Sequence, residues 1–173
     1  MAMTREEAVA TLAEGQAQLE VLLAALDDEQ LVRRATIGGG EWSALDLLAH
    51  LALWEEIAVE AAAEWRAGQV PWIEKVFHER RVDEVNAENQ HRSVDAPPAA
   101  VRARAAAAHQ ALVELVAGMT DVEWTARAPY TTARRDTLGM MLGSITGAPK
   151  RGFGHAFAHL PDLEAYVAEV RGG

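Results

Sequence analysis

The chain has 173 residues, and half of them are hydrophobic, so one domain over residues 1–173 with a sizeable core is expected. Asp and Glu outnumber Lys and Arg by 26 to 16, and this net charge of −10 argues against nucleic acid or an anionic membrane as a partner. The chain has no cysteine, which excludes disulfides and thiolate sites, and it shows no signal peptide or membrane-spanning run, so we expect a cytoplasmic protein.

The first predicted helix begins near Thr4, which has the spacing of a capping box with Glu7. Residues at helical intervals then form one face, in which a single glutamine interrupts the leucines: Leu12, Gln16, Leu19, Leu23 and Leu26. The three glycines of Gly38–Gly40 predict a loop after it.

The second predicted helix begins at Ser43, a favourable N-cap, and carries Asp46 in its first turn. Its inward stripe consists of Leu47, His50, Leu51, Trp54, Ile57 and Ala58, and Gly68 is a plausible C-terminal cap. Residues 69–95 mix apolar and charged side chains and predict one or two short helices packed across the others.

The third long helix is predicted from Pro97-Pro98 to Gly118, and Thr120 with Glu123 has the spacing of a second capping box. Residues 126–136 are predicted to be a loop. The four main helices, with a long helical connection between the second and the third, predict an all-α four-helix bundle.

The last helical region is predicted to begin near Asp136 or Thr137 and to be interrupted from Gly147 to Gly154. It resumes by about His155. Pro161 cannot donate a backbone hydrogen bond, so a kink or a break is expected there.

Two of the six histidines, His155 and His159, are four residues apart, so their rings lie on one face of a helix and can reach one ion. His50 interrupts an apolar stripe, where a neutral imidazole needs partners for its nitrogens. A divalent metal would bind one nitrogen of each ring, and three histidines with an open position are typical of reactive sites. Imidazole suits zinc, nickel, copper or iron(II). The alternative interpretation of His50 is a hydrogen-bonded core residue.

The segment Glu41–Glu55 (EWSALDLLAHLALWE) resembles the second-helix signature of the DinB-like superfamily. The signature residues are Trp42-Ser43, then Asp46, then Ala49-His50, then Trp54-Glu55. The pair His155 and His159 resembles the second hallmark of the superfamily, an HxxxH motif on the last helix. The resemblance covers nearly the whole chain and implies a DinB/YfiT-like four-helix bundle.

This resemblance also implies a divalent metal, for which we expect zinc or nickel, held by His50, His155 and His159. The superfamily includes YfiT-like metal hydrolases and mycothiol-dependent maleylpyruvate isomerases. The resemblance therefore implies a hydrolase, or an S-transferase that uses an exogenous low-molecular-weight thiol, acting on a small electrophile. No catalytic residue is assigned.

Two alternatives stay open. The stretches Arg66–Asn89 and His109–Leu112 are similar to the ClbS/DfsB branch, which implies a metal-free hydrolase that protects against a reactive small molecule. The other alternative is a non-enzymatic, dimeric ligand-binding bundle. Bundles associate through apolar helix faces, so a homodimer fits all three hypotheses.

Other polar residues have both a functional and a structural interpretation. Asp46 either orients the ring of His50 or is an anion at the surface near a helix start. Gln16 either points into a pocket or lies at the edge of its helix. Asn86 and Asn89 either line the mouth of the site or make hydrogen bonds in a turn. Arg134-Arg135 either attract an anionic substrate or are solvated in a loop. Three histidines have no partner at metal spacing and are interpreted as structural or exposed: His78, His91 and His109.

Overall fold

The computed structural model describes residues 3–38, 40–93, 95–130 and 136–172. Over these ranges the regular secondary structure is all α-helical, and β pairing is limited to isolated bridges. This confirms the predicted fold class. The helices are α1 (Arg5–Leu23), α2 (Asp28–Val32), α3 (Ala44–Arg66), α4 (Trp72–Glu79), α5 (Val82–Ser93), α6 (Pro98–Gly118), α7 (Asp121–Trp124), α8 (Leu138–Ile145) and α9 (His155–Gly172).

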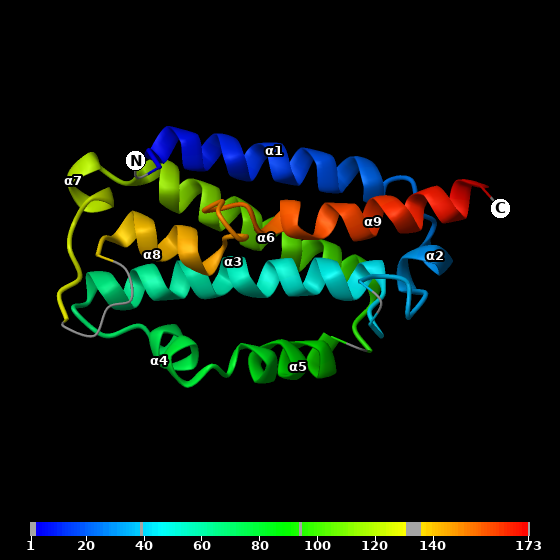
Figure 1. Ribbon diagram of the computed structural model, residues 1–173, viewed down its shortest axis with the longest axis horizontal. Coiled ribbons are helices and arrows are strands. Elements are labelled where there is room, and N and C mark those ends of the chain that lie inside the picture. Colours follow the sequence, from blue (N-terminus) through cyan, green and yellow to red (C-terminus); the bar gives the residue numbers. More distant parts are fainter. Residues whose placement is uncertain (1–2, 39, 94, 131–135, 173) are drawn as a thin grey trace.

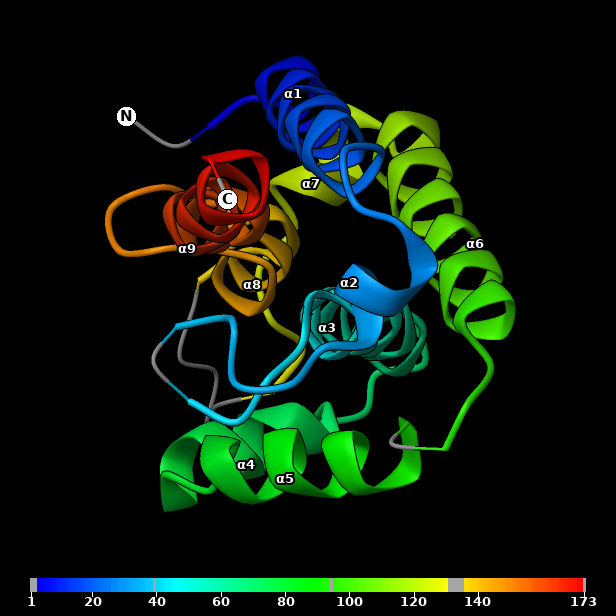
Figure 2. The same ribbon diagram turned by 90° about the vertical axis from the view of Figure 1, so that its right-hand side faces the viewer.

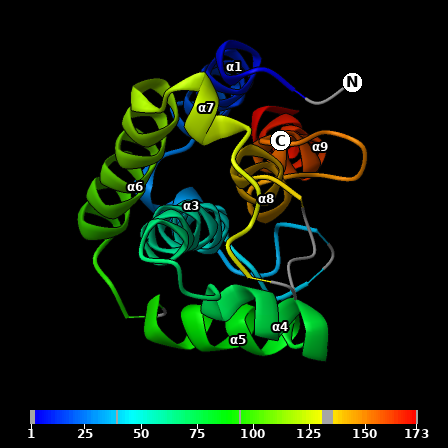
Figure 3. The ribbon, with the colours of Figure 1, turned by 90° about the vertical axis from the view of Figure 1, so that its left-hand side faces the viewer.

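Four positions of a bundle are filled by α1, α3, α6 and the pair α8–α9, in which α9 continues roughly where α8 ends (Figure 1). Viewed along the bundle, α4 and α5 lie outside this core and cover α3 (Figures 2 and 3). They form the predicted long connection between the second and third main helices. None of the described helices is long and apolar enough to cross a membrane.

Side-chain caps fix where several helices begin. The capping boxes of Thr4 with Glu7 and of Ser43 with Asp46 are both formed. Helix α2, which the sequence pattern did not predict, also begins with a capping box. The predicted box at Thr120 is only half present, because the carboxylate of Glu123 pairs with Arg66, 2.6 Å away, instead of returning to the backbone.

Polar contacts hold the hydrophilic helix α5 against the bundle. The buried Asn89 side chain donates a hydrogen bond to the carbonyl oxygen of Ala49 on α3 and accepts one from Arg104 on α6. Arg104 also makes a bidentate ion pair with Glu56, at 2.8 and 2.6 Å. Asn86 accepts a hydrogen bond from the indole of Trp54. The two asparagines therefore join α5 to the helix that carries His50.

The Gly147–Gly154 interruption folds back onto α8 as a tight turn. Ala148 and Arg151 exchange backbone hydrogen bonds, and the N–H of Phe153 donates to the carbonyl oxygen of Gly143. A Cβ on Gly147 would lie 2.4 Å from that same oxygen, so the close approach requires glycine. The N–H of His155 then donates to the carbonyl oxygen of Thr146, which fixes the start of α9.

The break considered at Pro161 is wrong, because α9 runs through this residue to Gly172. A proline inside a helix removes its own hydrogen bond to the carbonyl four residues earlier, which here belongs to Phe157. The hydrogen bond that joins the turns of His155 and His159 is not affected. Of the predicted glycine loop, Gly38 and Gly40 lie outside helices, while Gly39 is outside the described residues.

Helix α8 lies against α7 through a contact that only a glycine permits. A Cβ on Gly139 would lie 2.4 Å from the indole of Trp124. That indole stacks on Phe153 with ring centroids 5.7 Å apart and donates a hydrogen bond to the carbonyl oxygen of Met3. The ring is therefore fixed on several sides.

Gly139→Ala should lower the free energy of unfolding by about 1–3 kcal/mol, because the trapped indole cannot move away from the new methyl group. Gly118→Ala is the matched control, since nothing lies within 4 Å of a Cβ there and alanine favours the helix. Urea denaturation measures both. Equal stability of the two variants would contradict the packing described at Gly139.

Candidate metal centre

Three histidine side chains from two distant parts of the chain meet between α3 and α9. The Nε2 atom of His155 lies 3.0 Å from Nε2 of His50 and 3.2 Å from Nε2 of His159. One ligand atom from each ring lies within 4.8 Å of the other two. Within the described ranges, this is the one group of three or more histidine or acidic side chains that could hold a metal ion. The structure thus brings together the three residues predicted from the sequence.

Helix geometry and the turn before α9 produce this convergence. His50 projects from the buried stripe of α3 and is 6 % exposed. His155 and His159 lie in the first turns of α9, one above the other. Helix α9 can come close because α1 has Gly15 opposite Ala156 and Phe157, where an added Cβ would meet atoms at 3.1 and 3.2 Å.

Hydrogen bonding cannot satisfy this cluster by itself. Each imidazole nitrogen carries either one hydrogen or one lone pair, so Nε2 of His155 can form one good hydrogen bond. It nevertheless has two nitrogen neighbours at hydrogen-bond distance. A cation that accepts a lone pair from all three rings resolves the conflict. Ligands at a Zn–N distance of about 2 Å in a tetrahedron are about 3.3 Å apart, close to the two distances from Nε2 of His155.

Burial keeps the three rings neutral. It is the largest cause that lowers the pKa of His50 to about 2 and that of His155 to about 3, and the neighbouring imidazoles act in the same direction. Burial also lowers the pKa of His159, although the carboxylate of Asp162 opposes it. A neutral imidazole is the form that binds a metal, so the rings are ready to do so at neutral pH.

Two indole rings lie beside the cluster. The indole of Trp42 lies 4.8 Å from the ring of His50, and that of Trp54 lies 6.4 Å from it and 6.3 Å from the ring of His155, all between centroids. Phe77 of α4 stacks on Trp54 at 6.1 Å. These rings limit the access of water to one side of the cluster.

Asp46 does not orient His50. Its carboxylate accepts hydrogen bonds from the backbone N–H and the hydroxyl of Ser43, at 2.9 and 2.7 Å. The helix-start interpretation was therefore right, except that Asp46 is buried and not on the surface. Asn86 and Asn89 make contacts between helices, and Asn86 also lies beside His50, where its side chain opposes the lowering of the pKa of that ring. Arg134 and Arg135 are outside the described residues.

A second polar group, which the sequence analysis did not find, lies inside the bundle. Nδ1 of His109 on α6 is 2.8 Å from a carboxylate oxygen of Glu55 on α3, and both side chains are 16 % exposed. His78 and His91 are exposed, which agrees with one of the two interpretations, structural or exposed, given to them from the sequence. The signal for His109 is its position four residues after Ala105 and three before Leu112, two buried residues of α6, which puts all three on one face of that helix.

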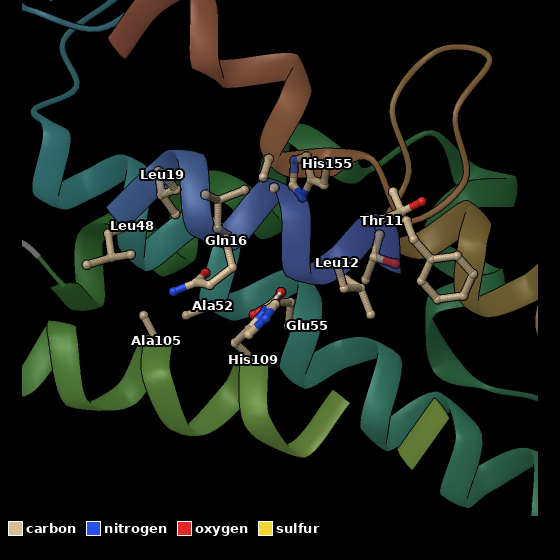
Figure 4. Close-up of a pocket in the computed structure, with 15 residues that line it drawn as sticks. Thr11, Leu12, Gln16, Leu19, Leu48, Ala52, Glu55, Ala105, His109 and His155 are labelled. Atoms are coloured by element: carbon tan, nitrogen blue, oxygen red, sulfur yellow. Dashed lines mark hydrogen bonds and ion pairs between the residues drawn. The ribbon is translucent and has the colours of Figure 1, made fainter. Parts of the chain in front are cut away.

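This pair lines a narrow cavity between α1, α3, α6 and the start of α9 (Figure 4). Gln16 of α1 lies beside it, although the amide of Gln16 donates a hydrogen bond to Glu20. His155 lies on the opposite wall, so the same residue borders both the cavity and the histidine cluster. Gln16 is thus at the cavity and not at the candidate metal centre.

Comparisons with known proteins agree with this architecture. The model of the DinB superfamily matches residues 5–146, which include His50 but end before His155 and His159. A crystal structure of an uncharacterised protein from Escherichia coli UTI89 is similar over 97 % of this chain and 95 % of that chain. Its TM-score of 0.79 at 19 % sequence identity shows a shared fold. No curated protein matches.

The family match covers most of the chain, and the helical architecture agrees with it. Together they confirm the resemblance first seen in the segment around His50. The chain belongs to the DinB superfamily.

Proposed function

We propose that this protein is a metal-dependent enzyme that acts on a small electrophile, as a hydrolase or as an S-transferase for a low-molecular-weight thiol. The observation that supports it most directly is the convergence of three Nε2 atoms that hydrogen bonds cannot satisfy. His50, His155 and His159 would hold the ion, and zinc or nickel suits three imidazoles. The ion supplies Lewis-acid chemistry, which lowers the pKa of a water or thiol and so makes it a nucleophile near neutral pH.

The residues of the chain position and shield this chemistry. The three rings come from helices that are fixed by the Ser43 cap and by the hydrogen bond from His155 N–H to Thr146, so their geometry is preorganised. Trp42 and Trp54 form an apolar wall that strengthens electrostatic interactions at the site. Because the chain has no cysteine, a sulfur nucleophile must come from a small molecule.

The proposed reaction is tested with a panel of small electrophiles, such as epoxides and activated alkenes, assayed with and without a low-molecular-weight thiol. Turnover that needs the thiol indicates transfer, and turnover without it indicates hydrolysis. Undiminished turnover by fully metal-stripped protein would contradict the proposal and favour the metal-free hydrolase. A lack of turnover on every electrophile would favour a ligand-binding bundle. The homodimer stays a prediction.

His159→Ala should reduce metal affinity about 100-fold or more, because even residues that only support metal ligands contribute 10–100-fold. Elemental analysis and competition with a chelator, on protein without an affinity tag, measure this loss. His78→Ala is the control, since His78 is exposed and outside the cluster. Equal metal content in the two variants would contradict the assigned ligands.

Metal-free protein should lose stability as the pH falls below about 6.5. The folded pKa values of about 2 and about 3 lie below the ordinary value of 6.5, so the unfolded chain binds more protons over this range. Each of the two groups contributes up to about 1.4 kcal/mol per pH unit, so the free energy of unfolding should fall by about 2–3 kcal/mol per pH unit between pH 6 and pH 4. Urea denaturation at several pH values, with a chelator present, measures the slope.

His50→Leu should make this slope shallower, because leucine fills the buried position without binding a proton. His78→Ala should leave the slope as in the wild type. A slope that is the same in wild type and His50→Leu would show that His50 titrates normally in the folded protein.

A further inference from the structure

The candidate metal centre borders the interior cavity through one side chain, His155. Its Nε2 atom faces His50 and His159. Its other ring nitrogen, Nδ1, is buried and has no hydrogen-bond partner in the described part of the chain. A buried polar atom without a partner costs free energy. This nitrogen therefore needs a hydrogen-bond partner other than the protein atoms around it.

The cavity supplies room and polarity for such an acceptor. Its volume of about 20 Å³ is enough for about one water molecule. Its lining residues include Glu55, His109 and Thr146. The Thr146 hydroxyl donates to the carbonyl oxygen of Leu142 and can still accept a hydrogen bond.

Charge determines the direction of the hydrogen bonds. When Nε2 of His155 gives its lone pair to a cation, the hydrogen of the ring lies on Nδ1 and must be donated. A carboxylate is the strongest acceptor in the cavity. His109 occupies one oxygen of Glu55 at 2.8 Å, and a carboxylate has lone pairs for further donors. Figure 4 shows His155 on one wall and the Glu55–His109 pair on the opposite one.

We infer that the cavity holds ordered water, which accepts a hydrogen bond from Nδ1–H of His155 and donates one toward the carboxylate of Glu55. Glu55 and His109 are then positioning residues: His109 fixes the carboxylate, and the carboxylate fixes the orientation of the His155 ring through water. This inference rests on the proposed metal function and adds a buried hydration site and two residues to it.

Glu55→Gln tests the inference, with Glu56→Gln as the matched control. The control removes the same charge from the next residue of α3, which pairs with Arg104 away from the cavity. The probe is zinc, added to metal-free protein in competition with a chelator. Zinc affinity should fall 10–100-fold in Glu55→Gln and stay unchanged in Glu56→Gln.

A second readout follows the hydrogen bond itself. Long-range ¹⁵N–¹H correlation spectra of the zinc-loaded protein report the Nδ1–H group of His155. This resonance should shift in Glu55→Gln and stay in place in Glu56→Gln. Ala105→Leu, which fills the cavity without touching the pair chemically, should move the resonance and lower the affinity in the same way, so the test does not depend on one variant folding.

An Nδ1–H resonance that is unchanged in both Glu55→Gln and Ala105→Leu overturns the inference, and so does an equal shift in Glu56→Gln. If the wild-type protein binds neither zinc nor nickel, the proposed function fails separately. The same spectra of the metal-free protein then decide whether Glu55 reaches His155 through water.

Discussion

The function proposed for this protein depends on one constraint, which is that an imidazole nitrogen can make only one strong in-plane bond. Nε2 of His155 has two other imidazole nitrogens within 3.2 Å. In water such crowding would relax by rotation of the side chains. Here burial and the aromatic rings around His50 hold the imidazole rings in place. Because the pKa values of His50 and His155 are low, these two rings stay neutral and do not repel each other as cations.

The convergence of the three imidazole rings depends on close approaches between backbone segments. The rings converge only if α9 begins at a fixed point and lies near α1. The first condition depends on the turn over Gly143 and Gly147, and the second on Gly15, where a side chain would meet α9. The glycine-rich interruption therefore does not weaken the site. It provides the fixed start of the helix that carries two of the three histidines.

Much of this was predictable from the sequence, because helix periodicity and caps are local signals. The stripe around His50 and the Ser43 cap indicated α3, and the spacing of His155 and His159 placed both rings on one face. What could not be predicted depends on contacts between distant segments. The destination of the Glu123 side chain and the pairing of Glu55 with His109 are decided by tertiary packing.

The Glu55–His109 pair shows how a single helix can serve two environments. His50 and Glu55 are five residues apart on α3, which turns them about 140° from each other around the helix axis. One side chain faces α9 and the candidate metal, and the other faces α6 and the cavity. His155 borders both, so we expect a change in the cavity to reach the candidate metal centre through one imidazole ring. Through its second nitrogen, this ring is the inferred link between the Glu55–His109 pair and the candidate metal centre.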